Sequence, residues 1–205
     1  SEASGGAAGG SGSAPKEDLV AVLGSEPLTM NPIDNSDLNT SNVLTQMFEN
    51  LVTMDQNLTV QPQLAESWEQ VDDTTVRFHL RKGVKFHNGE EMKASDVVFS
   101  IKRMAESPKM KHVGGIIDPA KIVAEDDYTV LVGTFEPAPT LLPNLTYYGA
   151  MIMNEKAVAE LGDQIGRQAI GTGPFKMVEW KSGESFVMER FDDYLGGPTK
   201  LKTDT

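Results

Sequence analysis

The chain has no cysteine among its 205 residues, and this absence removes several kinds of chemistry. Without cysteine the sequence can form no disulfide, no thiolate nucleophile and no cysteine-ligated zinc site. No apolar run approaches the roughly 18 residues that a membrane-spanning helix needs. Basic residues are also scarce, because 18 Lys and Arg stand against 30 Asp and Glu and give a net charge of -12. Such an acidic chain is not expected to bind nucleic acid or an anionic membrane surface.

The remaining composition is that of a globular protein preceded by a polar segment. Hydrophobic residues make up 39% of the sequence and charged residues 23%, so most of the chain should bury a core. The exception is the start, SEASGGAAGGSGSAP, in which no aliphatic side chain is larger than alanine. Residues 1–17 are therefore predicted to be a flexible tether, with a cloning linker or an ordinary disordered tail as the alternative. Residues 18–205 contain no long linker and are predicted to be one ordered lobe.

The pattern of apolar residues predicts an α/β fold, with a mixed sheet, helices and several β-hairpins. A continuous apolar run at residues 18–24 predicts a strand buried on both faces. After a loop with two prolines, residues 40–51 have apolar side chains at helical spacing, with Asn39, Thr40 or Ser41 as the N-cap. Short helices are expected at 138–145 and at 155–161, the second ended by Gly162. Polar turns between apolar flanks predict hairpins at 51–60, 67–81, 121–134 and 175–191.

The stretch GVKFHNGEEMKASDVVFSIKRM, residues 83–104, concentrates a histidine, two glutamates and an aspartate. A metal site, an acid/base pair and a purely structural segment could each explain it. The structural explanation is favoured, with His87 in a turn where its ring can bond to backbone. Ser95 is then the expected N-cap of a helix, and Asp96 lies in its first turn, where the helix dipole favours an acid. Lys102 and Arg103 should face water.

Catalytic and metal-binding patterns are not found in the sequence. His79, His87 and His112 form no pair at the spacing of a helical metal site, so no metal and no cofactor are predicted. No serine has a histidine beside it, and the acid pairs at 72–73 and 126–127 suit tight turns. Dispersed carboxylates leave a hydrolase open as an alternative. The stretch IGTGPF at 170–175 lacks the spacing of a phosphate loop, which leaves a hinge, a ligand-facing loop or a plain turn.

Three long stretches together resemble one family of binding proteins. They are LTMNPIDNSDLNTSNVLTQMFENLVTMDQNLTVQPQLAESWEQVDD, FHLRKGVKFHNGEEMKASDVVFSIKRM and IGTGPFKMVEWKSGESFVMERFDDYLGGPTKL. Their order and spacing are similar to those of the family 5 extracellular solute-binding proteins, which serve peptide and nickel ABC transporters. The resemblance covers nearly all of residues 18–202. Two departures occur near the end, where the family has Asn in place of Phe191 or Asp192, and Trp in place of Leu195.

The resemblance implies a first lobe like that of the type II periplasmic binding proteins, truncated within a longer two-lobed protein. It implies a monomeric, non-enzymatic substrate-binding component of an ABC transporter, which captures an oligopeptide or dipeptide and passes it to a membrane permease. Another solute, such as a nickel complex or a sugar, is an alternative, and a surface interaction domain is a further one. It also implies an extracytoplasmic location, either periplasmic or as a cell-surface lipoprotein of a Gram-positive-type bacterium. The lipid anchor would be a cysteine upstream of Ser1, and it is the only membrane contact expected.

The resemblance also suggests which residues line the ligand cleft. Glu26 could pair with a peptide amino terminus, the two tyrosines could offer ring surface and hydroxyls, and the glycine-rich loop could offer backbone donors. Because one lobe holds half of such a cleft, binding by this chain is expected to be weak or absent. The full predicted set is Ser25, Glu26, Pro27, Met30, Asn31, Tyr147, Tyr148, Gly171, Thr172 and Gly173.

Overall fold

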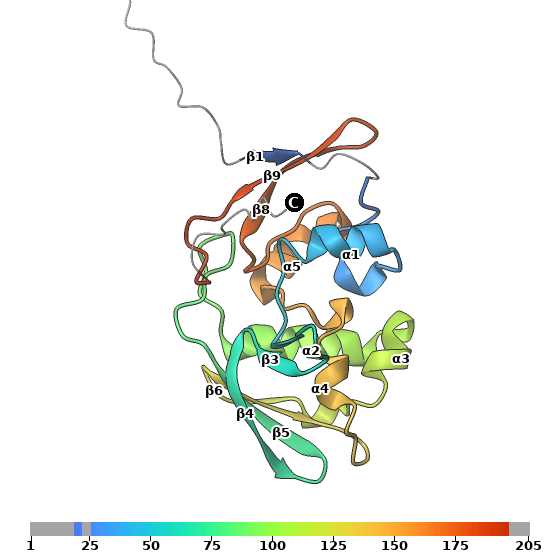
Figure 1. The fold of residues 1–205 in the computed structure, drawn as a ribbon, viewed down its shortest axis with the longest axis vertical. Helices are drawn as coiled ribbons and strands as arrows, with labels where there is room; N and C mark the ends of the chain where they lie inside the picture. The colour runs from blue at the N-terminus through green and yellow to red at the C-terminus, as the bar shows by residue number, and fades with distance from the viewer. Residues whose placement is uncertain (1–18, 22–25, 197–205) are drawn as a thin grey trace, which may run out of the picture.

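The structure is a computed structural model that describes residues 19–21 and 26–196. The predicted tether, residues 1–17, and the predicted site residue Ser25 lie outside the described residues. Figure 1 shows a sheet at each end of the molecule's long axis, with most of the helices between them. The first and last described segments meet in the sheet at one end, and the middle of the chain forms the other end.

The described strands form three sheets, and every pairing in them is antiparallel. The predicted mixed sheet is therefore not found in this part of the chain, because short turns join most neighbouring strands and such turns favour antiparallel pairs. The first strand, β1, lies at an edge of its sheet, with β9 as its one described partner. The sheets, in spatial order, are β1 Leu19–Ala21, β9 Ser185–Arg190 and β8 Phe175–Lys181; β2 Val52–Met54 and β3 Val60–Pro62; and β4 Ala65–Asp72, β5 Thr75–Leu80, β7 Thr129–Gly133 and β6 Val123–Asp126.

All four predicted hairpins are present. They are β2–β3, β4–β5, β6–β7 and β8–β9. In β5 the side chains of Val76, Phe78 and Leu80 are buried on one face, as the alternation in the sequence predicts. The β8–β9 turn contains Gly183 with a φ of 75°, a conformation that glycine adopts without strain.

Helices are short except for α2. The α-helices are α1 Leu38–Leu44, α2 Ala94–Glu106, α3 Lys111–Gly114, α4 Leu141–Asn144 and α5 Glu155–Leu161. The predicted end of α5 at Gly162 is confirmed. Short 3-10 helices lie between the other elements: η1 Pro32–Asp34, η2 Pro108–Met110, η3 Pro119–Lys121, η4 Tyr148–Ala150 and η5 Gly162–Gly166.

Helix α1 begins and ends earlier than the sequence suggested. Its N-cap is Asp37, whose Oδ2 accepts bonds from the amide and the hydroxyl of Thr40, each at 2.9 Å. The predicted caps Asn39, Thr40 and Ser41 thus lie inside the first turn. A carboxylate at the N-terminus is also favoured by the helix dipole, which gives Asp37 an advantage over neutral caps.

Helix α2 begins at Ala94, so Lys93 and not Ser95 is its N-cap. Asp96 is the third helical residue, and its Oδ2 accepts the amide of Lys93 at 3.0 Å, which closes the first turn from inside the helix. The prediction that Arg103 faces water is wrong. Its guanidinium lies against the sulfur of Met153 and donates to Asn31 Oδ1 at 3.2 Å.

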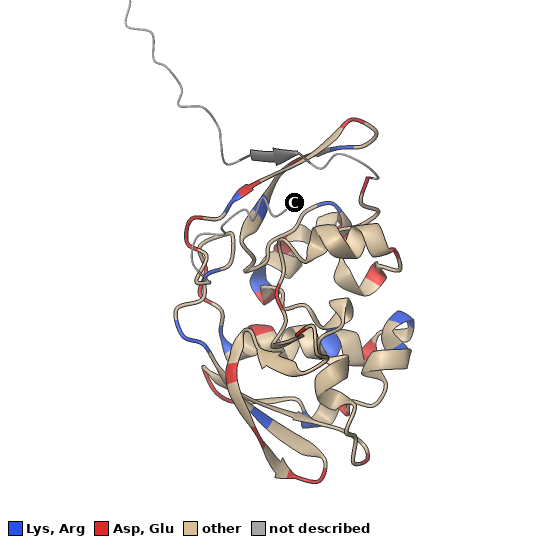
Figure 2. Ribbon diagram, viewed as in Figure 1, with Lys and Arg blue, Asp and Glu red and all other residues tan. Residues whose placement is uncertain are grey.

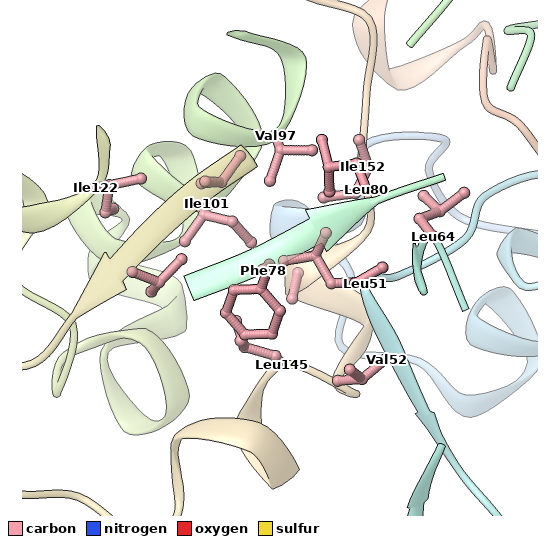
Figure 3. Packing of buried hydrophobic residues seen from close by; sticks show 14 of the residues in the cluster. Leu51, Val52, Leu64, Phe78, Leu80, Val97, Ile101, Ile122, Leu145 and Ile152 are labelled. Atoms are coloured by element: carbon pink, nitrogen blue, oxygen red, sulfur yellow. The ribbon is translucent and has the colours of Figure 1, made fainter. Parts of the chain in front are cut away.

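Two hydrophobic clusters form the core. The larger one surrounds the sheet that contains β5, and Figure 3 shows residues such as Phe78, Leu80 and Ile101 gathered around that strand. The smaller one lies beneath β8 and β9 and includes Leu44, Met47, Phe48, Phe175 and Met188. Tyr148 is partly buried against both clusters, so η4 lies where they meet.

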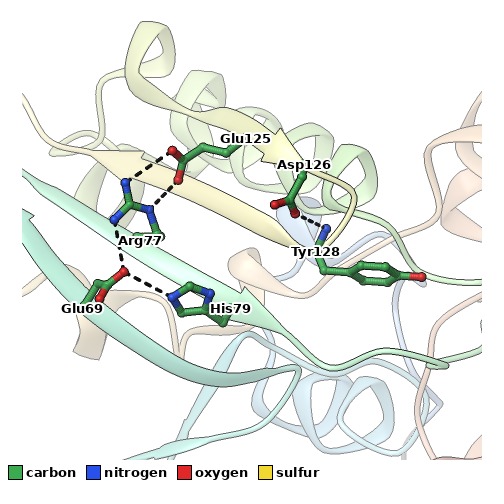
Figure 4. A network of polar contacts seen from close by, with 6 residues as sticks. All are labelled: Glu69, Arg77, His79, Glu125, Asp126 and Tyr128. Atoms are coloured by element: carbon green, nitrogen blue, oxygen red, sulfur yellow. Dashed lines mark hydrogen bonds and ion pairs between the residues drawn. The ribbon is translucent and has the colours of Figure 1, made fainter.

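The outer face of the larger sheet is polar. Arg77 donates to Glu125 through Nε at 2.6 Å and to Glu69 through Nη1 at 3.1 Å, and His79 contacts Glu69 (Figure 4). His79 thus lies on the solvent side of its strand, opposite the buried Phe78 and Leu80. Figure 2 shows acidic and basic residues interspersed along the described chain. Exposed ion pairs of this kind contribute modestly to stability.

The corrected helix caps predict a difference between two substitutions. Asp37→Ala removes two hydrogen bonds at the start of α1 and should destabilise the fold by about 1 kcal/mol. Ser95→Ala changes an exposed residue that is not a cap and should stay within about 0.5 kcal/mol of wild type. Urea denaturation of both variants measures the difference. A larger loss for Ser95→Ala would return the capping role to that residue.

Candidate ligand-binding face

A groove lies between α1, the start of β2 and the segment before η4. Its volume is about 330 Å³. Two of the predicted site residues, Tyr147 and Tyr148, form part of its wall. The full lining is Ser41, Thr45, Phe48, Asn50, Val52, Thr53, Gln63, Thr146, Tyr147, Tyr148 and Met151.

The two tyrosines form a stacked and hydrogen-bonded pair. Their ring centroids are 4.0 Å apart, and the Tyr147 hydroxyl donates to the Tyr148 hydroxyl at 2.7 Å. Partial burial is the larger cause and this hydrogen bond the smaller one, and they raise the pKa of Tyr148 to about 12. The phenol of Tyr148 therefore stays protonated. His112 packs edge-on against Tyr147. The pair therefore offers a rigid aromatic surface with a neutral hydroxyl.

The predicted loop residue Glu26 is held by the β8–β9 hairpin. Its carboxylate accepts the indole N–H of Trp180 at 2.6 Å and the amide of Gly183 at 3.0 Å. These bonds, that of Trp180 first, lower the pKa of Glu26. Arg167 stacks on the Trp180 ring at 3.6 Å from its centroid. Glu26 is exposed, and its contacts tie the loop to the sheet.

The other predicted site residues of this loop that the structure describes, Pro27, Met30 and Asn31, are buried. Met30 is fully buried in the smaller cluster, and its amide donates to the carbonyl of Gly166. Asn31 is 4% exposed, donates to Asp34 at 2.8 Å and accepts from Arg103. Pro27 is buried too. The structure thus places Pro27, Met30 and Asn31 in the packing beneath the loop.

The glycine-rich loop packs against the end of α1. The amide of Gly173 donates to the carbonyl of Met47 at 2.9 Å, and that of Phe175 donates to Gln46, so the loop satisfies carbonyls that follow the helix. A Cβ on Gly171 would collide with the carbonyl oxygen of Met47, and one on Gly173 would lie 2.6 Å from its carbonyl carbon. These glycines are required for close backbone packing, and the Gly173 amide is used within the lobe.

His87 lies in the turn before α2 and connects that turn to the glycine-rich loop. Its Nδ1 accepts the amide of Gly171 at 3.2 Å, and its Nε2 donates to the carbonyl of Gly173 at 3.0 Å. The predicted bonding of this ring to backbone is confirmed. Because Nδ1 must accept, the ring must be neutral, and burial lowers the pKa of His87 to about 4.

A second buried group lies behind the loop. Glu49 is 8% exposed, and its carboxylate accepts the hydroxyls of Thr172 at 3.0 Å and Tyr194 at 3.1 Å. Burial raises the pKa of Glu49, and the two hydroxyls partly offset that effect. The Thr172 side chain is therefore used within the lobe as well.

The structure brings the predicted residues together only in part. Tyr147 and Tyr148 line the groove, Glu26 lies at the hairpin, and the loop at 171–173 is buried beside α1. The polar groove residues Asn50, Thr53 and Gln63 were not predicted from the sequence. No short-range pattern marks them, since they belong to strand ends and loops that only the fold brings beside Tyr147.

Two further properties concern the described part of the chain. In residues 19–21 and 26–196, no three His, Asp or Glu side chains come together in a way that could hold a metal ion. None of the helices in those ranges combines the length and apolar character needed to cross a membrane.

The buried neutral ring of His87 should make the fold less stable in acid. Between a pKa of about 4 in the folded chain and 6.5 in the unfolded chain, only the unfolded chain binds the proton. Stability from this group is complete above the unfolded value and is lost as pH falls toward the folded value, by at most about 3 kcal/mol. Denaturation at neutral and acidic pH should show a smaller loss for His87→Gln than for wild type. The exposed control His112→Gln should keep the full loss, and equal behaviour of both variants would contradict this role.

Gly171→Ala should destabilise the fold because the methyl group would meet the Met47 carbonyl and the Phe48 ring. Overpacking of this kind costs about 1–3 kcal/mol. The matched control is Gly166→Ala, whose methyl would meet only Thr29 Oγ1, at 3.3 Å. Thermal unfolding should separate the two variants, and equal melting temperatures would rule out the tight contact.

Comparison with known proteins places this fold in a family. The sequence profile described as "Bacterial extracellular solute-binding proteins, family 5 Middle" matches residues 59–203. The periplasmic oligopeptide-binding protein OppA of Haemophilus influenzae is 32% identical over 196 residues, which cover 85% of this chain and 36% of OppA. The chain therefore spans little more than a third of that relative's length.

Solved structures agree with the sequence match. The binding protein DppA of Helicobacter pylori, in complex with the peptide STSA, has a TM-score of 0.76 and 27% identity, over 85% of this chain and 39% of DppA. MoaA of A. tumefaciens R10, in complex with mannopinic acid, has a TM-score of 0.77 and 29% identity, over 84% and 37%. The predicted part of a periplasmic binding protein fold is confirmed. The chain belongs to the bacterial extracellular solute-binding proteins of family 5.

Proposed function

We propose that the chain is the first-lobe portion of a substrate-binding component of an ABC transporter, and that its solute is a peptide. The family match over residues 59–203 carries this proposal. Support for a peptide comes from OppA, named as an oligopeptide-binding protein, and from DppA, solved with a peptide. The groove suits such a ligand, because it combines hydroxyls, amides and a tyrosine surface.

On this proposal the ligand lies between this lobe and a second one that closes over it. Tyr147 and Tyr148 face the ligand. The protein works outside the cytoplasm and delivers the ligand to a permease in the membrane. The predicted residue Glu26 lies at the β8–β9 hairpin and would exchange its contacts there for a peptide amino group of the ligand. The glycine-rich loop supports the face from behind, through the contacts of Gly171 and Gly173 described above.

MoaA gives a specific reason to keep a second ligand class. It is similar in fold to this chain and was solved with mannopinic acid, which is not a peptide. A small solute of another class is therefore the alternative to a peptide. The two are separated by titrating both classes against the same chain.

Binding of a short peptide to this chain should be weak, with a Kd in the millimolar range or above, because one lobe supplies half the contacts. In heteronuclear NMR titrations with trialanine, the amides around Tyr147 and Tyr148 should shift, and those around His79 on the outer sheet should not. Tyr148→Phe should weaken the response several-fold while His79→Ala leaves it unchanged. A micromolar Kd for the peptide by calorimetry would contradict the prediction that this chain holds only half of the site. A response to sugars and not to peptides would contradict the proposal that the ligand is a peptide.

A further inference from the structure

The groove beside Tyr147 has an unusual lining for so acidic a chain. None of its eleven residues is Asp, Glu, Lys, Arg or His. Four carry hydroxyls on Ser or Thr, two carry side-chain amides and three are aromatic. The nearest buried acid in sequence, Glu49, is bonded to Thr172 and Tyr194 instead. The groove therefore offers hydrogen bonds without charge.

The orientation of Asn50 is determined by its neighbours. Its Nδ2 donates to the carbonyls of Leu145 at 2.9 Å and Tyr147 at 2.8 Å, which only an NH₂ group can do. Among the described residues, Asn50 Oδ1 has no protein donor. The residue is 7% exposed and lines the groove, so this oxygen is an acceptor held in place by two bonds on the other side of the amide.

Gln63 is oriented in the opposite sense. Its Oε1 accepts the backbone amide of Asn50 at 2.8 Å, which leaves Nε2 without an acceptor in the described part of the chain. Nε2 can donate two hydrogen bonds. Gln63 and Asn50 are thus joined to each other, and these two lining residues carry one free donor group and one free acceptor between them. The Thr53 hydroxyl, also in the lining, can serve as either.

A fixed donor beside a fixed acceptor is complementary to an amide, which presents a carbonyl oxygen and an N–H. A charged group placed there would lose hydration and meet no oppositely charged residue in the groove lining, and such a loss is costly. An uncharged amide replaces its water bonds with Gln63 and Asn50 and covers the Tyr147 and Tyr148 rings.

We infer that this groove is a subsite for one uncharged amide of the ligand and that it selects against charge at that point. The inference rests on the proposed function and names the part of the ligand that this lobe holds. The amide could be a peptide bond or the side chain of Asn or Gln, and the two differ in substitution at nitrogen.

The test is a set of NMR titrations of the 205-residue chain with small probes. N-acetylglycine N-methylamide represents a peptide bond and propionamide a side-chain amide, while propionate and propylammonium are the charged counterparts. The two neutral probes should shift the side-chain NH₂ signals of Gln63 and Asn50. Each charged probe should bind about tenfold more weakly than propionamide. Whichever neutral probe binds more tightly identifies the source of the amide.

Gln63→Glu is the decisive variant. It keeps Oε1 as the acceptor for the Asn50 amide and replaces the free donor group with a charged oxygen. Propionamide should then bind about tenfold more weakly, and propylammonium should bind better than to wild type. Gln56→Glu adds the same charge at an exposed turn of the β2–β3 hairpin, outside the groove, and should change neither.

The outcomes separate this inference from the proposed function. If trialanine shifts the face while charged and neutral probes bind equally, or while Gln63→Glu leaves propionamide binding within about twofold, the amide subsite is wrong and peptide capture stands. If neither trialanine nor any probe shifts the groove signals, both are wrong. Tighter binding of the neutral probes, lost in Gln63→Glu and kept in Gln56→Glu, supports the subsite.

Discussion

The close approach of the loop at 171–173 to the end of α1 is the contact on which the rest of the lobe depends. Here the amide of Gly173 meets the carbonyl of Met47, and no side chain fits between the two backbones. His87 completes the joint by bonding to Gly171 and Gly173 through its two ring nitrogens. Three segments far apart in the sequence are thereby held without any ion pair. Because such a joint relies on neutral hydrogen bonds, it is insensitive to salt and sensitive to protonation of one ring.

A second joint of the same kind fixes α2 against α5. Asp96 closes the first turn of α2 through one oxygen and, through the other, accepts the amide of Glu155 at 2.9 Å, at the start of α5. Ser100 accepts the amide of Met153 at 2.8 Å. One carboxylate near two helix N-termini is favoured by both helix dipoles. These contacts join the two hydrophobic clusters and hold the segment that leads from Tyr148 to α5.

The distribution of charge follows from this architecture. Ion pairs such as Arg77 with Glu125 lie on the outer face of the larger sheet. Water there can solvate the parts of the charged groups that the ion pair leaves unbonded. The groove beside Tyr147 has no charged lining residue. On the proposed function, such a division leaves the groove to select an uncharged group of the ligand, because a charged group would find no oppositely charged residue in the lining.

Local sequence patterns determined the hairpins, the helix that ends at Gly162 and the buried face of β5, since turn residues and side-chain alternation act over a few positions. They also carried the family resemblance, which the matched profile confirms. The cap of α1 was misplaced because Asp37 precedes the apolar residues at helical spacing, and only the folded geometry shows that its carboxylate bonds to Thr40. Arg103 was assigned to water because its partners Asn31 and Met153 are distant in sequence.

The tertiary structure alone decided the pairing of Asn50 with Gln63 and the use of Gly171 and Gly173 as packing contacts. Each depends on two backbones meeting across the fold, and no periodicity within one segment encodes where its neighbour will be.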